Sequence, residues 1–389
     1  MTSLLSIGHH GQTESSKSCG NTGSSKSRSQ IAQTSVKTGT SIEYAEQEDL
    51  KMTETTISAN IVPSKSWNNP NKHYATCLAS PWYESILELQ DTIFHGTVDF
   101  FHRTLGYKYA LLPSTTDSIS SPMGLGSDSL LAAISLEGFD TYLADSMQFG
   151  LEYFLRIQKS APGAYYVGTT FRGEDPDSMH PGWSITSLIL DKHADIVQAI
   201  AGNVSHITDF IAILEKNDNS LPRITVSQAL ELSEISSDPE AWRFVLDDDH
   251  TKGRLLTRIG ERALLKRFGA VWLTEMDHLS VPFYQAFSPG TKNTKALCAD
   301  LLIGPGEILG LGQRHLDAHG LNIALNMHQV PLDAYRWYSD IRDRNQGGII
   351  MQTTGWGMGL ERFLCWILSH DDVRDIAVMP RLKHVKFSP

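Results

Sequence analysis

The chain has 389 residues, 41% of them hydrophobic, which allows one large domain or two small ones with a substantial core. Its formal net charge of −11 gives no general attraction to nucleic acid, so a polyanionic partner would need a local basic patch. The four cysteines have no CxxC or other paired spacing, and no apolar run reaches about 18 residues. Composition therefore argues against a disulfide framework, a zinc site and a membrane-spanning segment, and favours a cytoplasmic protein.

Residues 1–75 are dominated by Ser, Thr, Lys, Gly, Asn and Gln, with almost no aromatic residue before Tyr44. Such a segment cannot bury enough apolar surface to order itself, so we predict a disordered tail ahead of one catalytic domain over residues 76–389. The first ten residues are too short an apolar stretch for a secretory signal. A mitochondrial presequence is a poor fit, because Arg28 is the only arginine among the first hundred residues.

An amphipathic helix is predicted after the tail. Ser80 and Pro81 supply a cap and a first-turn proline, and apolar residues from Ile86 to Phe101 mark one helical face. Residues 107–112 then form a short strand, residues 114–129 a polar loop, and residues 142–155 the start of another amphipathic helix.

A strand, a polar loop and a second strand are predicted between residues 165 and 190. The first strand, 165–170, leads into a loop that begins Phe171-Arg172-Gly173-Glu174, and residues 185–190 form the second strand. Helices are predicted at 191–215, near 226–234 and at 252–267. Taken alone, Arg172 and Glu174 could equally form a surface ion pair.

A β-hairpin is predicted from residue 295 to residue 311, around the turn Gly304-Pro305-Gly306. This hairpin puts Asp300 and Glu307 on facing strands, and Arg314 follows seven residues after Glu307.

Near the end of the chain, glycines at alternate positions, 355, 357 and 359, lead into a helix with Arg362 in its first turn. Glycines let a flat ligand lie against the backbone, while a helix N-terminus and an arginine both attract phosphate. By itself the pattern fits a Gly-rich turn before a core helix equally well.

The stretch from Gly355 to Met379-Pro380-Arg381 resembles motif 3 of the class II aminoacyl-tRNA synthetases, in the aspartyl/asparaginyl branch. The helix and strand before Pro113 are similar to motif 1, and the strand, loop and strand around Arg172 are similar to motif 2. The pattern Asp-x6-Glu-x6-Arg, formed by Asp300, Glu307 and Arg314, resembles the residues that bind magnesium and the substrate side chain in this branch. The resemblance implies an α+β class II fold, an antiparallel sheet flanked by helices. It also implies a homodimer formed through the helix at 83–105 and the strand after it.

The family's chemistry implies a role for each matching residue. A carboxylate that attacks the α-phosphate of ATP must overcome repulsion between anions, which requires cations on the phosphates. Arg172 would hold the α-phosphate and the substrate carboxylate, Arg362 the γ-phosphate, and Asp300 with Glu307 a Mg²⁺ ion. Adenine would lie between an aromatic ring and Arg362. The ATP-binding residues implied are Arg172, Glu174, His180, Trp183, Glu307, Gly357, Gly359 and Arg362, with Arg172 and Arg362 catalytic.

The amino-acid site implied by the resemblance contains Ser146, Gln148, Glu152 and Arg314. Aspartate-specific relatives have a lysine where Leu151 stands, whereas asparagine-specific relatives have a glutamate at the position of Glu152, which favours asparagine. Ser146-Met147 is instead similar to an archaeal AMP-forming asparagine synthetase of this branch that acts on aspartate, so both substrates stay open. Leu125 stands where the branch has the glutamate that meets the substrate amino group, with Asp128 nearby.

The acceptor is predicted from what precedes the core. Tandem relatives carry an N-terminal OB-fold of about 100 residues that grips the anticodon, whereas only the tail precedes the core here, and tRNA charging needs many phosphate contacts. We therefore expect a ligase that forms an aminoacyl adenylate and passes it to a small nitrogen nucleophile, ammonia or an amine, with release of AMP. An asparagine–tRNA ligase and a non-catalytic ligand-binding paralogue are the alternatives.

Overall fold

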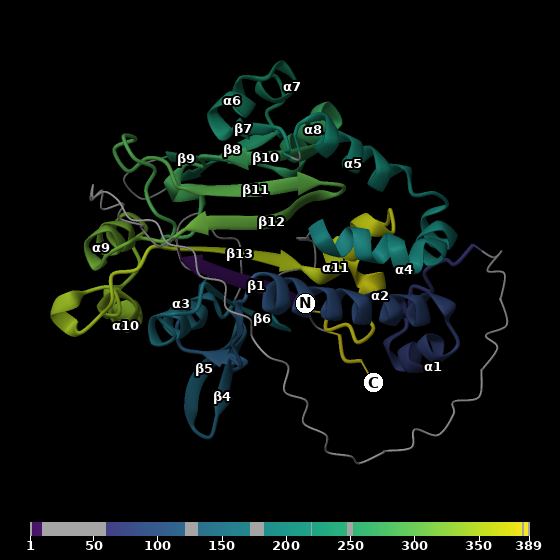
Figure 1. The fold of residues 1–389 in the computed structure, drawn as a ribbon, viewed down its shortest axis with the longest axis horizontal. Helices are drawn as coiled ribbons and strands as arrows, with labels where there is room; N and C mark the ends of the chain where they lie inside the picture. Colours follow the sequence, from purple (N-terminus) through teal and green to yellow (C-terminus); the bar gives the residue numbers. More distant parts are fainter. Residues whose placement is uncertain are drawn as a thin grey trace, which may run out of the picture. The chain divides into compact units, whose positions relative to one another are not determined.

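The computed structural model describes residues 2–9, 60–120, 131–171, 183–218, 220–246, 252–382 and 385–387. Their main feature is an eight-stranded sheet in the order β2-β6-β1-β13-β12-β11-β10-β7 (Figure 1). Neighbouring strands are antiparallel, except that β2 runs parallel to β6 and β7 parallel to β10. The strands, in sheet order, are Lys108–Tyr109, Gly163–Thr169, Thr2–His9, Thr353–Gly359, Gly306–Gln313, Cys298–Ile303, Ala270–Thr274 and Arg223–Thr225.

The largest hydrophobic core joins this sheet to four helices, which lie at the right of the view in Figure 1. Buried Leu89, Val197, Phe210 and Phe363 show that each helix turns an apolar face to this core. The helices are α2 (Pro81–Val98), α4 (Trp183–Ala201), α5 (Ser205–Lys216) and α11 (Leu360–Ile367). A six-residue π-helical stretch, η3 (Asp99–Thr104), extends α2, so the predicted helix at 83–105 is confirmed.

A second core lies around α9 (Ala318–Met327) and α10 (Arg336–Asp340), and buries Phe149 of α3 (Gln148–Ile157), Phe283 and Tyr338. A third lies around the remaining strands and helices, β8 (Trp242–Leu246), β9 (Lys252–Leu256) and α6 to α8. Those helices are α6 (Val226–Glu231), α7 (Ser233–Ser236) and α8 (Arg258–Phe268). None of the helices in the described ranges is long and apolar enough to cross a bilayer.

Smaller elements complete the described chain. Strands β3 (Thr115–Thr116), β5 (Phe139–Leu143) and β4 (Ala133–Leu136) form a sheet in that order. Short helices are α1 (His73–Leu78), α12 (Val373–Ile376) and the 3₁₀ turns η1 (Ser66–Asn68), η2 (Pro70–Lys72), η4 (His278–Ser280), η5 (Leu332–Tyr335) and η6 (Arg344–Gln346).

Several sequence predictions are confirmed and others need adjustment. The hairpin with Asp300 and Glu307 forms as β11 and β12, with an irregularity in register at Leu301 and Leu302. The helix predicted at 191–215 is the end of α4 followed by α5, and that predicted at 252–267 is strand β9 followed by α8. The sequence at 252–256 pairs along its whole length with β8, which overrides its helical pattern.

The prediction of a second strand at 185–190 is wrong, because these residues form the first half of α4. Buried Thr186, Ile189 and Val197 are spaced as one helical face, and a kink with non-helical dihedral angles at His193 separates the two halves of the helix. The place beside β6 in the sheet is taken by β1 instead.

The prediction of a disordered tail over 1–75 is wrong for residues 2–9 and 60–75. Residues 2–9 form β1, whose backbone pairs with β6 on one side and with β13 on the other. A central strand is stabilised by main-chain hydrogen bonds on both sides. These bonds do not depend on the side chains, so amino-acid composition cannot predict them. Trp67 donates from Nε1 to Asp375 Oδ1 at 2.8 Å, so the domain is ordered well before residue 76. Residues 10–59 lie outside the described part of the chain.

Candidate active site

A cavity of about 290 Å³ lies against strands β11, β12 and β13 and the start of α3. It brings together residues as far apart in the sequence as Asp145 and Met358. Of the predicted site residues, those in its wall are Ser146, Gln148, Asp300, Glu307, Arg314 and Gly357. Glycines face one another across its floor, since Gly310 pairs with Gly357 and Gly312 with Gly355. A Cβ atom at Gly312 would overlap Gln285 Oε1, so the absence of a side chain at this glycine lets Gln285 pack directly against the strand.

Other predicted residues are placed elsewhere or lie outside the described chain. Arg172, Glu174 and His180 fall in the undescribed residues 172–182, and only the backbone of Trp183, the first residue of α4, is described. Gly359 is the N-cap of α11 and is not part of the cavity wall.

Asp300 and Glu307 converge on one point of the cavity. A Cβ atom added at Gly310 would lie 3.1 Å from Glu307 Oε1 and 3.3 Å from Asp300 Oδ1, so both carboxylates stand above this glycine. Burial, then the charges of Glu307 and Glu261, raise the pKa of Asp300 well above its ordinary value. Adjacent half-buried carboxylates favour a cation between them, and Mg²⁺ is commonly bound by one or two carboxylates plus substrate phosphates. The pair therefore fits Mg²⁺, although no group of three potential metal ligands is found among the described residues.

Glu261 of α8 is a third carboxylate beside Glu307, behind the cavity wall, and no sequence pattern indicated it. Its Oε2 accepts a hydrogen bond from the backbone N–H of Glu307 at 3.3 Å. Burial, then the charge of Glu307, raises the pKa of Glu261 to about 7. The three acids come from two strands and a helix that sequence spacing alone does not bring together.

Arg314 marks the other end of the cavity. Its guanidinium donates to Gln148 Oε1 at 2.7 Å and to Gln285 Oε1 at 3.0 Å, and it lies 4.8 Å from the centre of the Tyr284 ring. Gln148 in turn donates to the Tyr284 hydroxyl at 2.8 Å. On the cavity side, Arg314 is thus held in place by the neutral side chains of Gln148 and Gln285.

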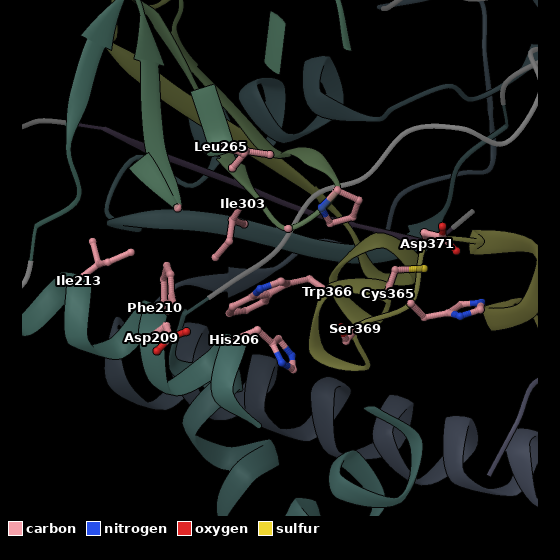
Figure 2. A pocket seen from close by; sticks show the side chains of 14 residues that line it. His206, Asp209, Phe210, Ile213, Leu265, Ile303, Cys365, Trp366, Ser369 and Asp371 are labelled. Carbon is pink, nitrogen blue, oxygen red and sulfur yellow. The ribbon is translucent and has the colours of Figure 1, made fainter. Parts of the chain in front are cut away.

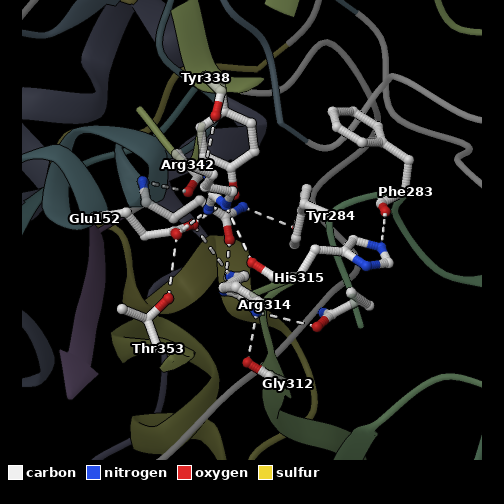
Figure 3. A network of polar contacts seen from close by, with 12 residues as sticks. Glu152, Phe283, Tyr284, Gly312, Arg314, His315, Tyr338, Arg342 and Thr353 are labelled. Carbon is white, nitrogen blue, oxygen red and sulfur yellow. Dashed lines mark hydrogen bonds and ion pairs between the residues drawn. The ribbon is translucent and has the colours of Figure 1, made fainter. Parts of the chain in front are cut away.

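Glu152 lies behind Arg314, completely buried, and does not line the cavity (Figure 3). The Tyr338 hydroxyl donates to Oε1 at 2.5 Å, Arg342 forms an ion pair with Oε2, and Arg314 Nε lies 3.7 Å from Oε1. Burial alone would raise the pKa of Glu152, but the charges of Arg342, Arg156 and Arg314 outweigh burial and lower it. In the structure its carboxylate is thus occupied by protein groups and orients Arg314, rather than standing at the cavity surface.

Arg362 lies in the first turn of α11, as predicted, and is almost completely buried. Its Nη1 donates to the backbone carbonyl of Glu307 at 3.2 Å. Arg362 therefore ties the helix after the glycine strand to the strand that carries an acidic residue of the cavity.

A pair of buried histidines contacts Gln285, the residue that binds Arg314 at this end of the cavity. His278 Nε2 donates to the carbonyl of Gln285 at 2.8 Å, so in the neutral ring Nδ1 accepts from His328 Nε2 at 3.0 Å. Burial lowers the pKa of His278 to about 4 and that of His328 to about 3. Both rings are therefore neutral near pH 7.

The buried histidine pair predicts acid sensitivity. A histidine whose pKa is lowered by folding stabilises the protein above its unfolded pKa, near 6.5, and this stability is lost as pH falls toward 4. Replacing His328 with phenylalanine is expected to reduce the slope of unfolding free energy against pH by about 1.4 kcal/mol per pH unit between pH 6.5 and 4.5. Urea unfolding across this range measures the slope. The exposed His102→Phe is the matched control, and an equal slope in the two variants would contradict the prediction.

A separate cavity of about 460 Å³ lies between α5, α8, the β11–β12 turn and the end of α11 (Figure 2). Phe210, Ile213, Leu265 and Trp366 form its apolar walls. None of the predicted site residues lines it, and it is distinct from the cavity that holds Asp300 and Arg314.

Comparison with known proteins places this geometry in a family. The family model described as tRNA synthetases class II (D, K and N) matches residues 69–383. The chain belongs to this family. As a class II tRNA synthetase it is a ligase, and the resemblance of its motifs is confirmed.

Individual relatives of this class II synthetase include asparagine and aspartate enzymes. The asparagine–tRNA ligase of Koribacter versatilis (strain Ellin345) is 25% identical over 332 residues, covering 77% of this chain and 69% of the relative. The asparaginyl-tRNA synthetase of Pyrococcus horikoshii, complexed with asparaginyl-adenylate, matches with a TM-score of 0.66 and 18% identity, over 82% of this chain and 73% of that one. The aspartyl tRNA synthetase from Entamoeba histolytica matches with a TM-score of 0.57 and 15% identity, over 82% and 62%. The structural matches confirm the class II fold.

The expectation of a small nitrogen acceptor in place of tRNA is not supported by these comparisons, whose named relatives are tRNA ligases and synthetases. The expectation rested on the lack of a recognisable OB-fold pattern ahead of the core and on the net charge of −11, which sums over the whole chain. Binding of a polyanion depends on the local electrostatic potential of the groove it enters, and the net charge of the whole chain does not measure that potential.

Proposed function

We propose that this class II synthetase activates asparagine with ATP and transfers it to tRNA, with aspartate as the competing substrate. The observation that carries the proposal is the single cavity in which an acidic end, Asp300 and Glu307, faces a cationic end, Arg314 with Gln148. These are the two features that a mixed anhydride between an amino acid and AMP requires: charge control at the phosphates and a polar clamp on the side chain.

The activation step divides between the two ends. The amino-acid carboxylate attacks the α-phosphorus of ATP, the bond to the β-phosphate oxygen breaks, and pyrophosphate leaves. Mg²⁺ held by Asp300 and Glu307 would neutralise phosphate charge when bound. Arg362, which lies beside Glu307, supplies a further cation. The motif resemblance assigns Arg172 as another cation. It also assigns Glu174, His180 and Trp183 to the nucleotide.

The side-chain end supports asparagine. Arg314 can donate to a side-chain carbonyl oxygen, and Gln148 and Gln285 offer amide groups beside it. Glu152, at 3.7 Å from Arg314 Nε, partly offsets the guanidinium charge, which disfavours a full negative charge on the ligand relative to a neutral carboxamide.

A homodimer is part of the proposal. The face of α2 away from the core exposes Leu87 and Phe94, and β2 with the residues after it exposes Tyr109 and Leu111. Apolar side chains gathered on one helix and an adjoining strand are typical of a subunit interface.

The test is amino-acid-dependent exchange of pyrophosphate into ATP, run with each of the twenty amino acids and then followed by tRNA charging. We expect exchange with asparagine above all others and transfer to tRNA from the same organism. Arg314→Lys, which keeps the charge but not the two-pronged donor, should lose asparagine-dependent exchange. No exchange with any amino acid would overturn the proposal, and amide formation from ammonia without tRNA charging would contradict the acceptor.

A further inference from the structure

Asp145 lies in the cavity wall between β5 and α3, and neither the sequence motifs nor the activation step above uses it. The residue is only 3% exposed. Its carboxylate is fixed by Ser120, whose backbone N–H donates to Oδ1 at 3.1 Å and whose hydroxyl donates to Oδ2 at 2.8 Å. The neighbouring Ile119 carbonyl accepts from the Tyr335 hydroxyl at 2.7 Å, so this segment is anchored on η5.

The roles given so far to the charged side chains of the cavity provide no carboxylate for the α-ammonium group of the amino acid. Within the described residues, the charged side chains that line it are Asp145, Asp300, Glu307 and Arg314. Asp300 and Glu307 converge above Gly310, at the phosphate end, and Arg314 serves the side-chain end. An amino acid also carries an α-ammonium group, and a buried ammonium requires a carboxylate or several oxygen acceptors.

We propose that Asp145 receives the α-ammonium group of the amino-acid substrate, an inference that rests on the proposed function. Asp145 lines the same wall of the cavity as Ser146 and Gln148, two residues of the predicted amino-acid site. A carboxylate has about four acceptor positions and can keep both Ser120 hydrogen bonds while accepting from a ligand. Because Ser120 already fixes its geometry, little ordering is needed when the ligand binds.

The position also explains a departure in the sequence. Where the aspartyl/asparaginyl branch has a glutamate for the amino group, this chain has Leu125, in residues that lie outside the described part. Asp145 supplies the same chemical group from a different element, one joined to that loop through Ser120.

The experiment compares two non-reactive adenylate analogues, asparaginyl sulfamoyl adenosine and the same molecule without its amino group. Dissociation constants are measured by calorimetry on the wild-type protein and on Asp145→Asn, which is isosteric; its Oδ1 can accept from the Ser120 backbone N–H while its Nδ2 donates to the Ser120 hydroxyl. The wild type is expected to bind the amino form about 10- to 100-fold more tightly than the des-amino form. Asp145→Asn should bind both alike, while the exposed Asp140→Asn keeps the wild-type ratio.

A second variant, Asp145→Glu, keeps the charge but moves the carboxylate by one methylene, and should retain part of the preference. Equal losses for both analogues in Asp145→Asn would show a purely structural role and overturn the inference, as would an unchanged ratio. If the wild type binds neither analogue and exchanges no pyrophosphate, the proposed function itself fails. If exchange with asparagine proceeds and the ratio survives Asp145→Asn, only the role of Asp145 is wrong.

Discussion

Replacing Glu152 with glutamine is expected to lower the free energy of unfolding by about 3–5 kcal/mol. The carboxylate is completely buried and is the common partner of Arg342, Arg156 and Arg314. Glutamine preserves the volume but leaves these buried guanidinium groups without an opposing charge, which is the costly half of a buried ion pair. Because Arg314 would also shift, asparagine-dependent pyrophosphate exchange should fall with stability.

Chemical unfolding at pH 7.5 measures the effect on stability. Glu88→Gln on the exposed side of α2 is the matched control and should leave the protein unchanged. A second comparison is Thr353→Val, which removes only the 3.1 Å hydrogen bond to Glu152 Oε2 and should cost about 1 kcal/mol. If Glu152→Gln behaved like Thr353→Val, the arginines would not depend on this carboxylate.

The strands that form the floor of the cavity could be predicted from patterns of neighbouring residues in the sequence. The hairpin of β11 and β12 follows from its turn Gly304-Pro305-Gly306, and the glycine strand followed by α11 follows from alternate glycines before an amphipathic run. In each case the signal lies within about twenty-five consecutive residues, so no long-range contact has to be known. Asp300, Glu307 and Arg314 could be placed for the same reason.

The misses share a physical cause, dependence on partners far away in the sequence. Strand β1 is held by main-chain pairing with β6 and β13, and its short apolar stretch does not stand out within the mostly polar residues 1–75. Residues 185–190 are apolar enough for a strand or a helix, and their burial beside the helices of the main core decides for α4. An apolar run of this length does not settle the choice without that context.

The side chains around the cavity show the same dependence. The resemblance placed Glu152 against the ligand, but Arg342, nearly two hundred residues later, occupies its carboxylate. Asp145 is identified only by its hydrogen bonds with Ser120 and its place in the cavity wall, and Glu261 only by its hydrogen bond with Glu307. Pattern thus predicted several residues that line the cavity, Asp300, Glu307 and Arg314 among them, while the three-dimensional contacts place Glu152 in the layer behind it.

The acidic end of the cavity is expected to respond in opposite ways in stability and in activity. Glu307→Gln should lower kcat/KM for pyrophosphate exchange by about 10²- to 10³-fold, the usual cost of removing one electrostatic group aimed at a reacting phosphate or oxyanion. The same change should stabilise the metal-free protein, because Glu307 helps to raise the pKa of both Asp300 and Glu261. Exchange assays at varied Mg²⁺ and thermal unfolding without metal measure the two effects, with the exposed Glu231→Gln as control.

The dependence of stability on pH follows from Glu261. Burial and Glu307 raise its pKa to about 7 from an ordinary value of 4.5, so the folded state holds a proton that the unfolded state has lost. Stability of the metal-free protein should therefore be greatest below about pH 4.5 as far as this group is concerned, and should fall by on the order of 3 kcal/mol as pH rises through 7. A cation bound by Asp300 and Glu307 favours the ionised acids, so millimolar Mg²⁺ should flatten or reverse this slope. The buried His278 and His328 give the opposite slope below pH 6.5, so the part due to Glu261 is measured as the difference in unfolding free energy between the wild type and Glu261→Gln. A difference that is flat between pH 5 and 7, or unchanged by Mg²⁺, would show that these carboxylates do not form one cation-dependent unit.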